Sequence, residues 1–247
     1  MHINISDTSK ELGEKAGEKA ASLIKDRINE NGEAHIILAT GTSQLETIKQ
    51  LISDPEIDWS KVVMFHLDEY IGLPESHPAS FRKYLKERFI NKIQPLKEYF
   101  LINGEADSNA ECNRLNNTIR EYPIDVAFVG IGENGHLAFN DPPADFEVED
   151  PYIIVDLDDK CRNQQLNEGW FNIFEEVPQQ AISMTIKQVC KSKHIICSVP
   201  DARKAEAVKC SLEGPISNLC PASILQEHPE CSFFLEKSSA KLLSKTG

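Results

Sequence analysis

The sequence predicts an α/β fold: a single Rossmann-like domain with a mainly parallel sheet flanked by helices, plus a lid segment over residues 156–176. Strand-sized apolar runs alternate with helix-sized amphipathic stretches along the whole chain, which is the pattern of parallel strands joined by crossover helices. No Pro-, Gly- or Ser-rich linker and no internal repeat divides the 247 residues. We therefore expect one domain over residues 1–247.

The N-terminal part of the chain sets the pattern. Apolar residues at helical spacing predict a helix over residues 7–31, and Gly32 provides its stop. The continuous apolar run 35–39 predicts a strand that is buried on both faces. A second helical stretch covers residues 44–52.

The same alternation continues toward the C-terminus. Polar segments that carry Gly and Pro, 68–78 and 131–145, predict loops between the later elements. The expected strands are 62–67, 99–102, 125–130, 152–155, 181–185, 194–199 and 231–235. The expected helices are 79–93, 109–121, a short one within 156–176, another between 185 and 194, and 201–212.

Charge and composition exclude several classes of protein. Lys and Arg number 26 against 39 Asp and Glu, a net charge of −13, and no basic run occurs, so nucleic acid is not an expected partner. The longest apolar stretches are strand-sized and the N-terminus lacks the pattern of a signal peptide, so no membrane association is expected. Seven cysteines without a C-x-x-C pair predict reduced thiols in a cytoplasmic protein.

Ligands of parallel sheets bind beyond the carboxyl ends of the strands, and three loops at that edge carry polar chemistry. The first loop reads Thr40-Gly41-Thr42-Ser43 and leads into a helix. Backbone N–H groups at a helix start, with hydroxyls beside them, can hold a phosphate. It is not a P-loop, because no G-K-[ST] follows. The alternative is that Thr42 or Ser43 only caps the helix.

The second loop places two acids, Asp68 and Glu69, at the end of the strand 62–67. Successive side chains of a strand point to opposite faces, so we expect one acid to face the cleft and the other to make loop hydrogen bonds. The alternative is a pair of solvated loop acids. His66 lies two positions earlier and is expected to be a packed histidine rather than a catalyst.

The third loop runs from Gly130 to Asp141 and contains three glycines and His136. Glycines after a buried strand let the backbone approach a ligand closely. A histidine oriented by a carboxylate is a candidate proton shuttle, while the alternative is a histidine that makes structural hydrogen bonds. No second histidine follows at i+4 and no ligand set is evident, so no metal is expected.

These blocks resemble the glucosamine-6-phosphate deaminase (isomerase) family, which is related to the 6-phosphogluconolactonases. The segment from Asp68 resembles the family block D-E-Y-x-G-L-x-x-x-H-P-x-S-[YF], and residues 130–140 resemble its G-x-G-x-N-G-H-x-A-F-N block. Residues 40–42 resemble its phosphate loop and 214–223 its C-terminal block. The similarity runs in order from near residue 10 to near residue 240.

The resemblance implies conversion of D-glucosamine 6-phosphate to D-fructose 6-phosphate and ammonia, with no cofactor and with a sugar phosphate as the partner of a monomer or homo-oligomer. His136 would catalyse ring opening, Asp141 would orient it, Asp68 would move the C2 proton to C1, and Asn134 would position the region of His136. The implied substrate-binding residues are Thr40, Gly41, Thr42, Ser43, Glu69, Gly132 and Lys204.

This chain departs from the family pattern at three places. Asn134 stands where many members have Asp, which removes one negative charge near His136, and Asp141 stands where Glu is usual. The segment 156–176 has no Arg at the position of the family's N-S-R-F-F motif, although Arg162 lies nearby. Its amides, acids and aromatic residues predict a lid that orders when ligand binds, and a static surface segment is the alternative.

Three other functions stay open at this point. One is a 6-phosphogluconolactonase-like hydrolase, but that family continues T-A-S-L-F-P where this chain has Leu137 to Asp141. Another is a deaminase that acts on a different amino-sugar phosphate, such as galactosamine 6-phosphate. The last is a non-catalytic sugar-phosphate binding protein, which could dispense with Asp68 and His136.

Overall fold

The computed structural model describes residues 1–244, and a seven-stranded parallel sheet forms its centre. The strand order is β1-β10-β9-β6-β2-β3-β5, and every neighbouring pair is parallel. The expected α/β class with a mainly parallel sheet is confirmed. The strands are β1 (His2–Ser6), β2 (Ala34–Leu38), β3 (Val62–His66), β5 (Glu98–Phe100), β6 (Val126–Val129), β9 (His194–Val199) and β10 (Cys231–Glu236).

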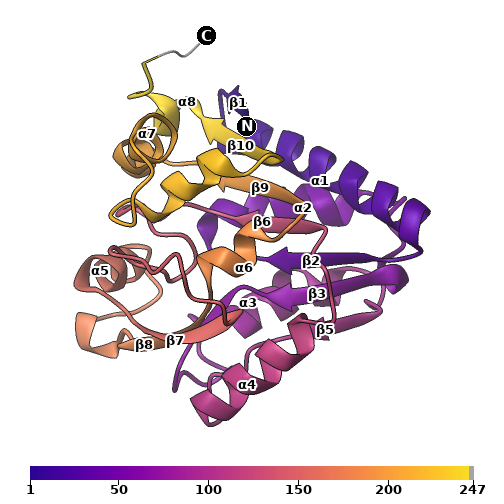
Figure 1. Ribbon diagram of the computed structural model, residues 1–247, viewed down its shortest axis with the longest axis horizontal. Coiled ribbons are helices and arrows are strands. Elements are labelled where there is room, and N and C mark those ends of the chain that lie inside the picture. The colour runs from indigo at the N-terminus through magenta and orange to yellow at the C-terminus, as the bar shows by residue number, and fades with distance from the viewer. Residues whose placement is uncertain (245–247) are drawn as a thin grey trace.

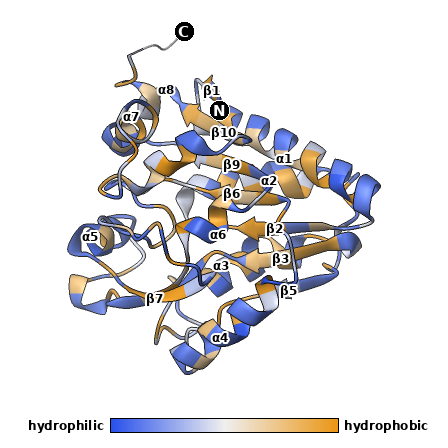
Figure 2. Ribbon diagram, in the orientation of Figure 1, coloured by the Kyte–Doolittle hydropathy of each residue, from blue (hydrophilic) through white to orange (hydrophobic). Residues whose placement is uncertain are grey.

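Helices cover both faces of this sheet because its strands are apolar on both sides. One face, with Ile36, packs against α1 (Ser9–Asn31), α2 (Leu45–Ser53) and α3 (Phe81–Arg88). The other face, with Ile37, packs against α4 (Ser108–Ile119), α6 (Ile186–Cys190) and α7 (Ala205–Glu213). Figure 2 shows the hydrophobic residues gathered on the strands and the hydrophilic ones on the outer helices.

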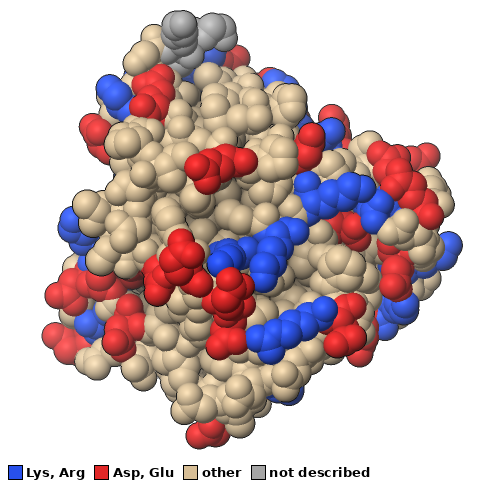
Figure 3. All heavy atoms as spheres, in the orientation of Figure 1, with Lys and Arg blue, Asp and Glu red and all other residues tan. Residues whose placement is uncertain are grey.

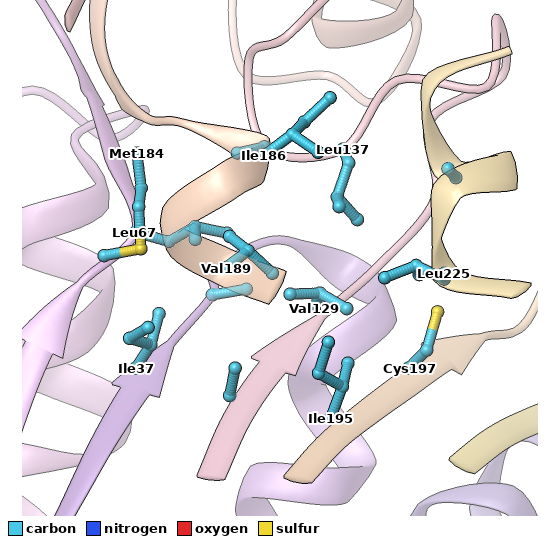
Figure 4. Close-up of a cluster of buried hydrophobic side chains, with 14 of the residues drawn as sticks. Ile37, Leu67, Val129, Leu137, Met184, Ile186, Val189, Ile195, Cys197 and Leu225 are labelled. Atoms are coloured by element: carbon cyan, nitrogen blue, oxygen red, sulfur yellow. The ribbon is translucent and has the colours of Figure 1, made fainter. Parts of the chain in front are cut away.

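The hydrophobic cluster on the face of the sheet that carries Ile37 extends to the loops at the carboxyl ends of the strands. Leu137, from the third polar loop, packs with Val129 of β6 and Ile186 of α6. Figure 4 shows Leu137 directed into this cluster, together with Ile195 and Leu225. The loop that carries His136 is thereby anchored in the protein interior by an apolar side chain, which restricts where His136 can lie.

A second, antiparallel sheet of three strands, β4-β8-β7, stands beside the first. Its strands are β4 (Asp68–Tyr70), β7 (Tyr152–Asp156) and β8 (Gln180–Met184), and α5 (Asp159–Asn167) follows β7. In Figure 1 this sheet and α5 lie together at the left of the molecule. They share an apolar cluster with Tyr70, Phe139 and Phe171.

Several elements differ from the expectations. Asp68 and Glu69 lie in a buried strand rather than a loop, because β8 pairs with their backbone and hydrogen bonds satisfy Glu69. The helix expected over 79–93 ends at Arg88, since Phe89 leaves the helical conformation at φ −129° and a short 3₁₀ turn follows. Strand β1 at the sheet edge and the short helix α8 (Lys237–Ala240) had no predicted counterpart.

The surface carries both signs of charge. On the face shown in Figure 3, Lys and Arg side chains gather across the middle and are bordered by Asp and Glu. Among the described residues, no helix combines the length and the apolarity that crossing a bilayer requires. The expected domain span ends at residue 247, and residues 245–247 lie outside the described part of the chain.

Candidate active site

A small polar pocket lies where the three polar loops meet the second sheet and α5. Its volume is about 90 Å³. The parallel strands β2, β6 and β9 end at this pocket, as expected for a sheet of this class. Its lining combines all three loops with residues of the segment 156–176: Ala39, Thr40, Gly41, Thr42, Ser43, Leu67, Asp68, Phe81, Gly130, Ile131, Gly132, His136, Ala138, Phe139, Gln164, Gln165, Glu168 and Lys204.

The loop after β2 presents its polar groups to the pocket. Gly41 has φ +91°, a left-handed value that favours glycine, and a 3₁₀ turn (Thr42–Gln44) begins directly after it. Neither this turn nor α2 is capped by a side chain, so the alternative in which Thr42 or Ser43 only caps a helix is wrong. The hydroxyls therefore remain available to a ligand.

Lys204 supplies the positive charge at this end of the pocket. Its side chain is buried, and burial lowers the pKa of its ammonium group, although the carboxylates of Glu168 and Glu133 oppose that shift. Within residues 1–244, no carboxylate lies at ion-pair distance from Lys204. A buried ammonium group without a paired anion is a favourable site for an anionic ligand.

Asp68, in strand β4, also lines the pocket. The side chain is 7% exposed, and burial, reinforced by the charge of Glu69, raises the pKa of its carboxyl group to about 8. A carboxylate with such a pKa is a stronger base than an ordinary aspartate once it is ionised. Asp68 is therefore the group in this pocket that is best suited to remove a proton from carbon.

Glu69 points away from the pocket, and its carboxylate forms hydrogen bonds with the first residues of α3. Its carboxylate accepts hydrogen bonds from the backbone N–H groups of Tyr70, Phe81 and Arg82, and from the hydroxyl of Ser80. The two neighbouring acids thus do different jobs, as their alternation along the strand predicts. The structure does not bring Glu69 to the pocket, and the idea of solvated loop acids is wrong for both residues.

His66 is a packed histidine, as expected. It is fully buried in β3, and Nδ1 accepts a hydrogen bond from the backbone N–H of Ile102. Burial, together with the nearby charge of Arg82, lowers the pKa of His66 to about 3, so the imidazole is neutral at physiological pH. It does not line the pocket.

His136 reaches the pocket from the glycine-rich loop after β6. Its imidazole lies against Gly132, and the backbone N–H of Gly132 donates to the carbonyl of His136 at 3.0 Å. Nδ1 lies 3.1 Å from Oδ1 of Asp141, but the ring is not aligned for a linear hydrogen bond. A small rotation of the ring would complete that bond, so Asp141 is placed to orient His136.

Asn134 and Asp141 lie behind His136 rather than in the pocket lining. The side-chain oxygen of Asn134 accepts from the backbone N–H of His136 at 3.1 Å, and Nδ2 donates to Asp141 at 3.0 Å. His136, Asp141 and Cys161 are of metal-ligating types, with ligand atoms within 4.8 Å of one another. Burial raises the pKa of the Cys161 thiol well above its ordinary value, so Cys161 stays protonated and is poorly suited to act as a thiolate ligand.

The segment 156–176 contributes pocket residues that the sequence analysis did not identify. Gln164, Gln165 and Glu168 line the pocket from α5 and the residue after it, and Gln164 accepts a hydrogen bond from the backbone N–H of Glu133. The spacing 164, 165 and 168 places these side chains on one face of a helix, a signal that the sequence does contain. Arg162 faces away, stacks on Phe174 at 4.0 Å and donates to the carbonyl of Val177.

Fold and site together define an α/β enzyme whose pocket combines a candidate anion site, a carboxyl group with a raised pKa and a histidine. The family model described as "Glucosamine-6-phosphate isomerases/6-phosphogluconolactonase" matches residues 7–233. The chain is 37% identical over 231 residues to the glucosamine-6-phosphate deaminase of Oenococcus oeni, which covers 93% of this chain and 95% of that protein. It is 36% identical over 230 residues, with the same coverage, to the enzyme of that name from Streptococcus pneumoniae.

Solved structures agree with the sequence relatives. A monomeric glucosamine-6-phosphate deaminase superposes with a TM-score of 0.90 at 33% identity, over 98% of this chain and 100% of that one. The 6-phosphogluconolactonase from Trypanosoma brucei gives a TM-score of 0.80 at 17% identity, over 98% of each chain, which shows a shared fold alone. The chain belongs to the family of glucosamine-6-phosphate isomerases and 6-phosphogluconolactonases.

Proposed function

We propose that this chain converts D-glucosamine 6-phosphate and water to D-fructose 6-phosphate and ammonia. The observation that carries the proposal is the meeting of Asp68, His136 and the Thr40–Ser43 loop with Lys204 in one pocket. The reaction needs an anion site, a base at C2 and a separate proton donor at the ring oxygen. The relatives of more than 35% identity are named for this activity.

The phosphate end of the substrate would bind at Thr40–Ser43 and Lys204. Hydroxyls and backbone N–H groups at the start of a helix favour a phosphate, and the buried ammonium of Lys204 adds charge. This fixed end would place the sugar ring between Asp68 and His136. Binding energy from the remote phosphate then positions the reacting carbon atoms.

His136 would open the ring. It would protonate the ring oxygen while the C1 hydroxyl loses its proton, which gives the open-chain amino aldehyde. Asp141 would hold the imidazole in the required orientation, and Asn134 would fix the backbone of His136 and one oxygen of Asp141. Gly132 serves this step because its missing side chain makes room for the ring.

Asp68 would then take the proton from C2 and return it to C1. The electron pair of the broken C2–H bond forms the C1–C2 double bond, and the aldehyde oxygen takes a proton from the neighbouring ammonium group, which gives a neutral enol with an amino group on C2. Protonation at C1 by Asp68 then moves the double bond to C2 and nitrogen. Water adds to the resulting iminium group, ammonia leaves, and the ketone forms. Because carbon is oxidised at C2 and reduced at C1, the sequence needs no external oxidant.

The lid would open to admit substrate and close over it. A volume of about 90 Å³ is well below the roughly 300–1,000 Å³ that is usual for ligand pockets, so the pocket would have to widen to admit a sugar phosphate. Gln164, Gln165 and Glu168 supply the closing wall. Exclusion of water by such a wall protects the reactive enol from side reactions.

A panel assay tests the proposal. The purified protein is incubated with glucosamine 6-phosphate, galactosamine 6-phosphate and 6-phosphogluconolactone, and ammonia, ketose phosphate and lactone loss are measured. We expect equal amounts of ammonia and fructose 6-phosphate from the first substrate. Turnover of the lactone alone, or of no member of the panel, would overturn the proposed function. A cytoplasmic setting is part of this proposal, supported by the seven free cysteines.

A further inference from the structure

The lid helix α5 begins in direct contact with the residues behind His136. Asp158 is the N-cap of α5: Oδ1 accepts from the backbone N–H of Cys161 at 2.6 Å. The other oxygen, Oδ2, accepts from Nδ2 of Asn134 at 3.4 Å, and the backbone N–H of Asp158 donates to Oδ2 of Asp141 at 3.1 Å. One residue therefore caps the lid helix and touches both groups behind His136.

The amide of Asn134 is the centre of this arrangement. Its Nδ2 is shared between Asp141 at 3.0 Å and Asp158 at 3.4 Å, while its oxygen accepts from the backbone of His136. A carboxylate at position 134 could not donate to either acid and would add a third negative charge. An amide at position 134 is therefore suited to a site with two carboxylates, that of Asp141 and that of Asp158 from the lid, because it can donate to both.

We propose that Asp158 is a positioning residue that couples closure of α5 to the His136–Asp141 pair. This inference rests on the function proposed above and adds a regulatory link to it. When α5 moves away, Asp141 loses the N–H donor on Oδ2 and Asn134 loses one of its two acceptors. Asp141 is then held on one side only, so His136 is correctly oriented only while the lid is closed.

The neighbouring groups are consistent with this link. The thiol of Cys161 in the first turn of α5 also lies within 4.8 Å of the carboxylate of Asp141 and the imidazole of His136, so this side chain moves away with the helix. Asn134 donates to one oxygen of Asp141 and the backbone of Asp158 donates to the other. The Asp141 side chain is only 7% exposed, so its carboxylate would be costly to leave unpaired. The hydrogen bonds of Asp141 therefore favour the closed position of the lid.

The test separates the contact of Asp158 with Asn134 from the role of Asp158 as the N-cap of α5. In Asp158→Ser, serine keeps the helix cap and the backbone N–H to Asp141, but its side chain is too short to reach Asn134. We expect kcat to fall about five- to tenfold, the worth of one ordinary hydrogen bond, with KM changed less than twofold. Asp107→Ser is the matched control, because Asp107 caps α4 far from the pocket and is exposed.

A double-variant cycle shows whether Asp158 acts through Asn134. We expect Asn134→Ala to lower kcat by more than Asp158→Ser, and the double variant to be no slower than Asn134→Ala alone. Additive losses, or a kcat for Asp158→Ser equal to that of the wild type and of Asp107→Ser, would overturn the inference.

A second measurement needs no turnover, so it separates this inference from the proposed function. The ring signals of His136 are followed by NMR in the unliganded protein. We expect them to shift and broaden in Asp158→Ser but not in Asp107→Ser, because only the former loosens the contact behind the ring. Unchanged His136 signals in Asp158→Ser would contradict the link even in a protein that proved inactive on every sugar phosphate.

Discussion

The imidazole of His136 lies so close to Gly132 that a Cβ on Gly132 would come within 2.2 Å of Cε1 and 2.3 Å of Nε2. Real Cβ atoms do not approach other atoms that closely, so any side chain at position 132 must displace the ring. The glycine-rich loop therefore does more than let the backbone approach a ligand. The absence of a side chain on Gly132 leaves the space that the imidazole ring of His136 occupies.

We expect Gly132→Ala to lower kcat by at least about a hundredfold, because a misplaced proton donor loses the contribution of general acid catalysis. Gly13→Ala is the matched control: its Cβ would also clash, at 2.3 Å from the side chain of Glu46, but between α1 and α2. The control should lower the melting temperature while the folded enzyme keeps its kcat. Full activity in Gly132→Ala would show that His136 does not need this position.

The raised pKa of Asp68 predicts a pH dependence. Burial raises the pKa of this carboxyl group to about 8, so the free enzyme holds it mainly protonated at pH 7 and ionised above pH 8. A base must be ionised, so kcat/KM should fall about tenfold for each pH unit below 8. The ammonium group of bound substrate favours the carboxylate, so the corresponding limb of kcat should lie at lower pH.

The measurement is the pH dependence of kcat/KM and of kcat from pH 5 to 9.5, supported by a carbon-13 NMR titration of the Asp68 carboxyl group. Asp26→Asn serves as the control, because Asp26 is an exposed acid on α1. A profile that is flat between pH 5 and 8, as an ordinary aspartate would give, would contradict the assigned role.

Much of this site could be predicted from the sequence. Thr40–Ser43, Asp68 and His136 follow apolar runs that become β2, β3 and β6, and parallel strands bring their carboxyl ends to one edge. The division of work between Asp68 and Glu69 followed from their alternation along the strand. These predictions rest on local sequence patterns, namely continuous apolar runs and the alternation of side chains along a strand. Such patterns arise because the strands of a parallel sheet are buried on both faces.

Other parts could not be predicted because they depend on contacts between distant segments. Strand β4 is three residues long and begins with two acids, so nothing local marks it as buried; its pairing with β8 lies more than 100 residues away in the chain. Asp158 caps α5, and its contacts with Asn134 and Asp141 follow only from where that helix packs. The spacing of Gln164, Gln165 and Glu168 marks a shared helix face in the sequence, but that this face lines the pocket also follows only from how α5 packs.

The phosphate of the substrate should be required. Free glucosamine lacks the group that Thr40–Ser43 and Lys204 would hold, so we expect kcat/KM at least roughly a thousandfold lower, or about 4 kcal/mol. Lys204→Met should remove most of this preference, whereas Lys209→Met, at an exposed position in α7 directly after Lys204, should leave it unchanged. Similar kcat/KM values for glucosamine and its 6-phosphate would contradict the phosphate site.

Residues 156–176 should exchange their amide hydrogens more slowly when ligand closes the lid. A suitable ligand is 2-amino-2-deoxyglucitol 6-phosphate, the reduced open-chain analogue that cannot isomerise. We expect protection in α5 and around Trp170 together with protection at Thr40–Ser43, since the pocket joins the two. Protection at Thr40–Ser43 without any change in 156–176 would favour a static lid.

The central claim is that Asp68 moves the proton between C2 and C1, and Asp68→Asn tests it most directly. The variant should fold well: a buried carboxyl group with a pKa raised to about 8 costs stability as pH rises from about 4 toward 8, and asparagine removes that cost. It should also bind the glucitol analogue with nearly unchanged affinity, because the phosphate site is intact.

Glucosamine 6-phosphate is incubated with each protein in deuterated water, and incorporation of solvent deuterium is measured in the recovered substrate and product alongside ammonia release. The wild-type enzyme should incorporate deuterium and release ammonia. In Asp68→Asn both rates should fall by at least about a thousandfold, because the amide cannot accept the C2 proton. Undiminished deuterium incorporation in a variant that binds the analogue would show that another group is the base.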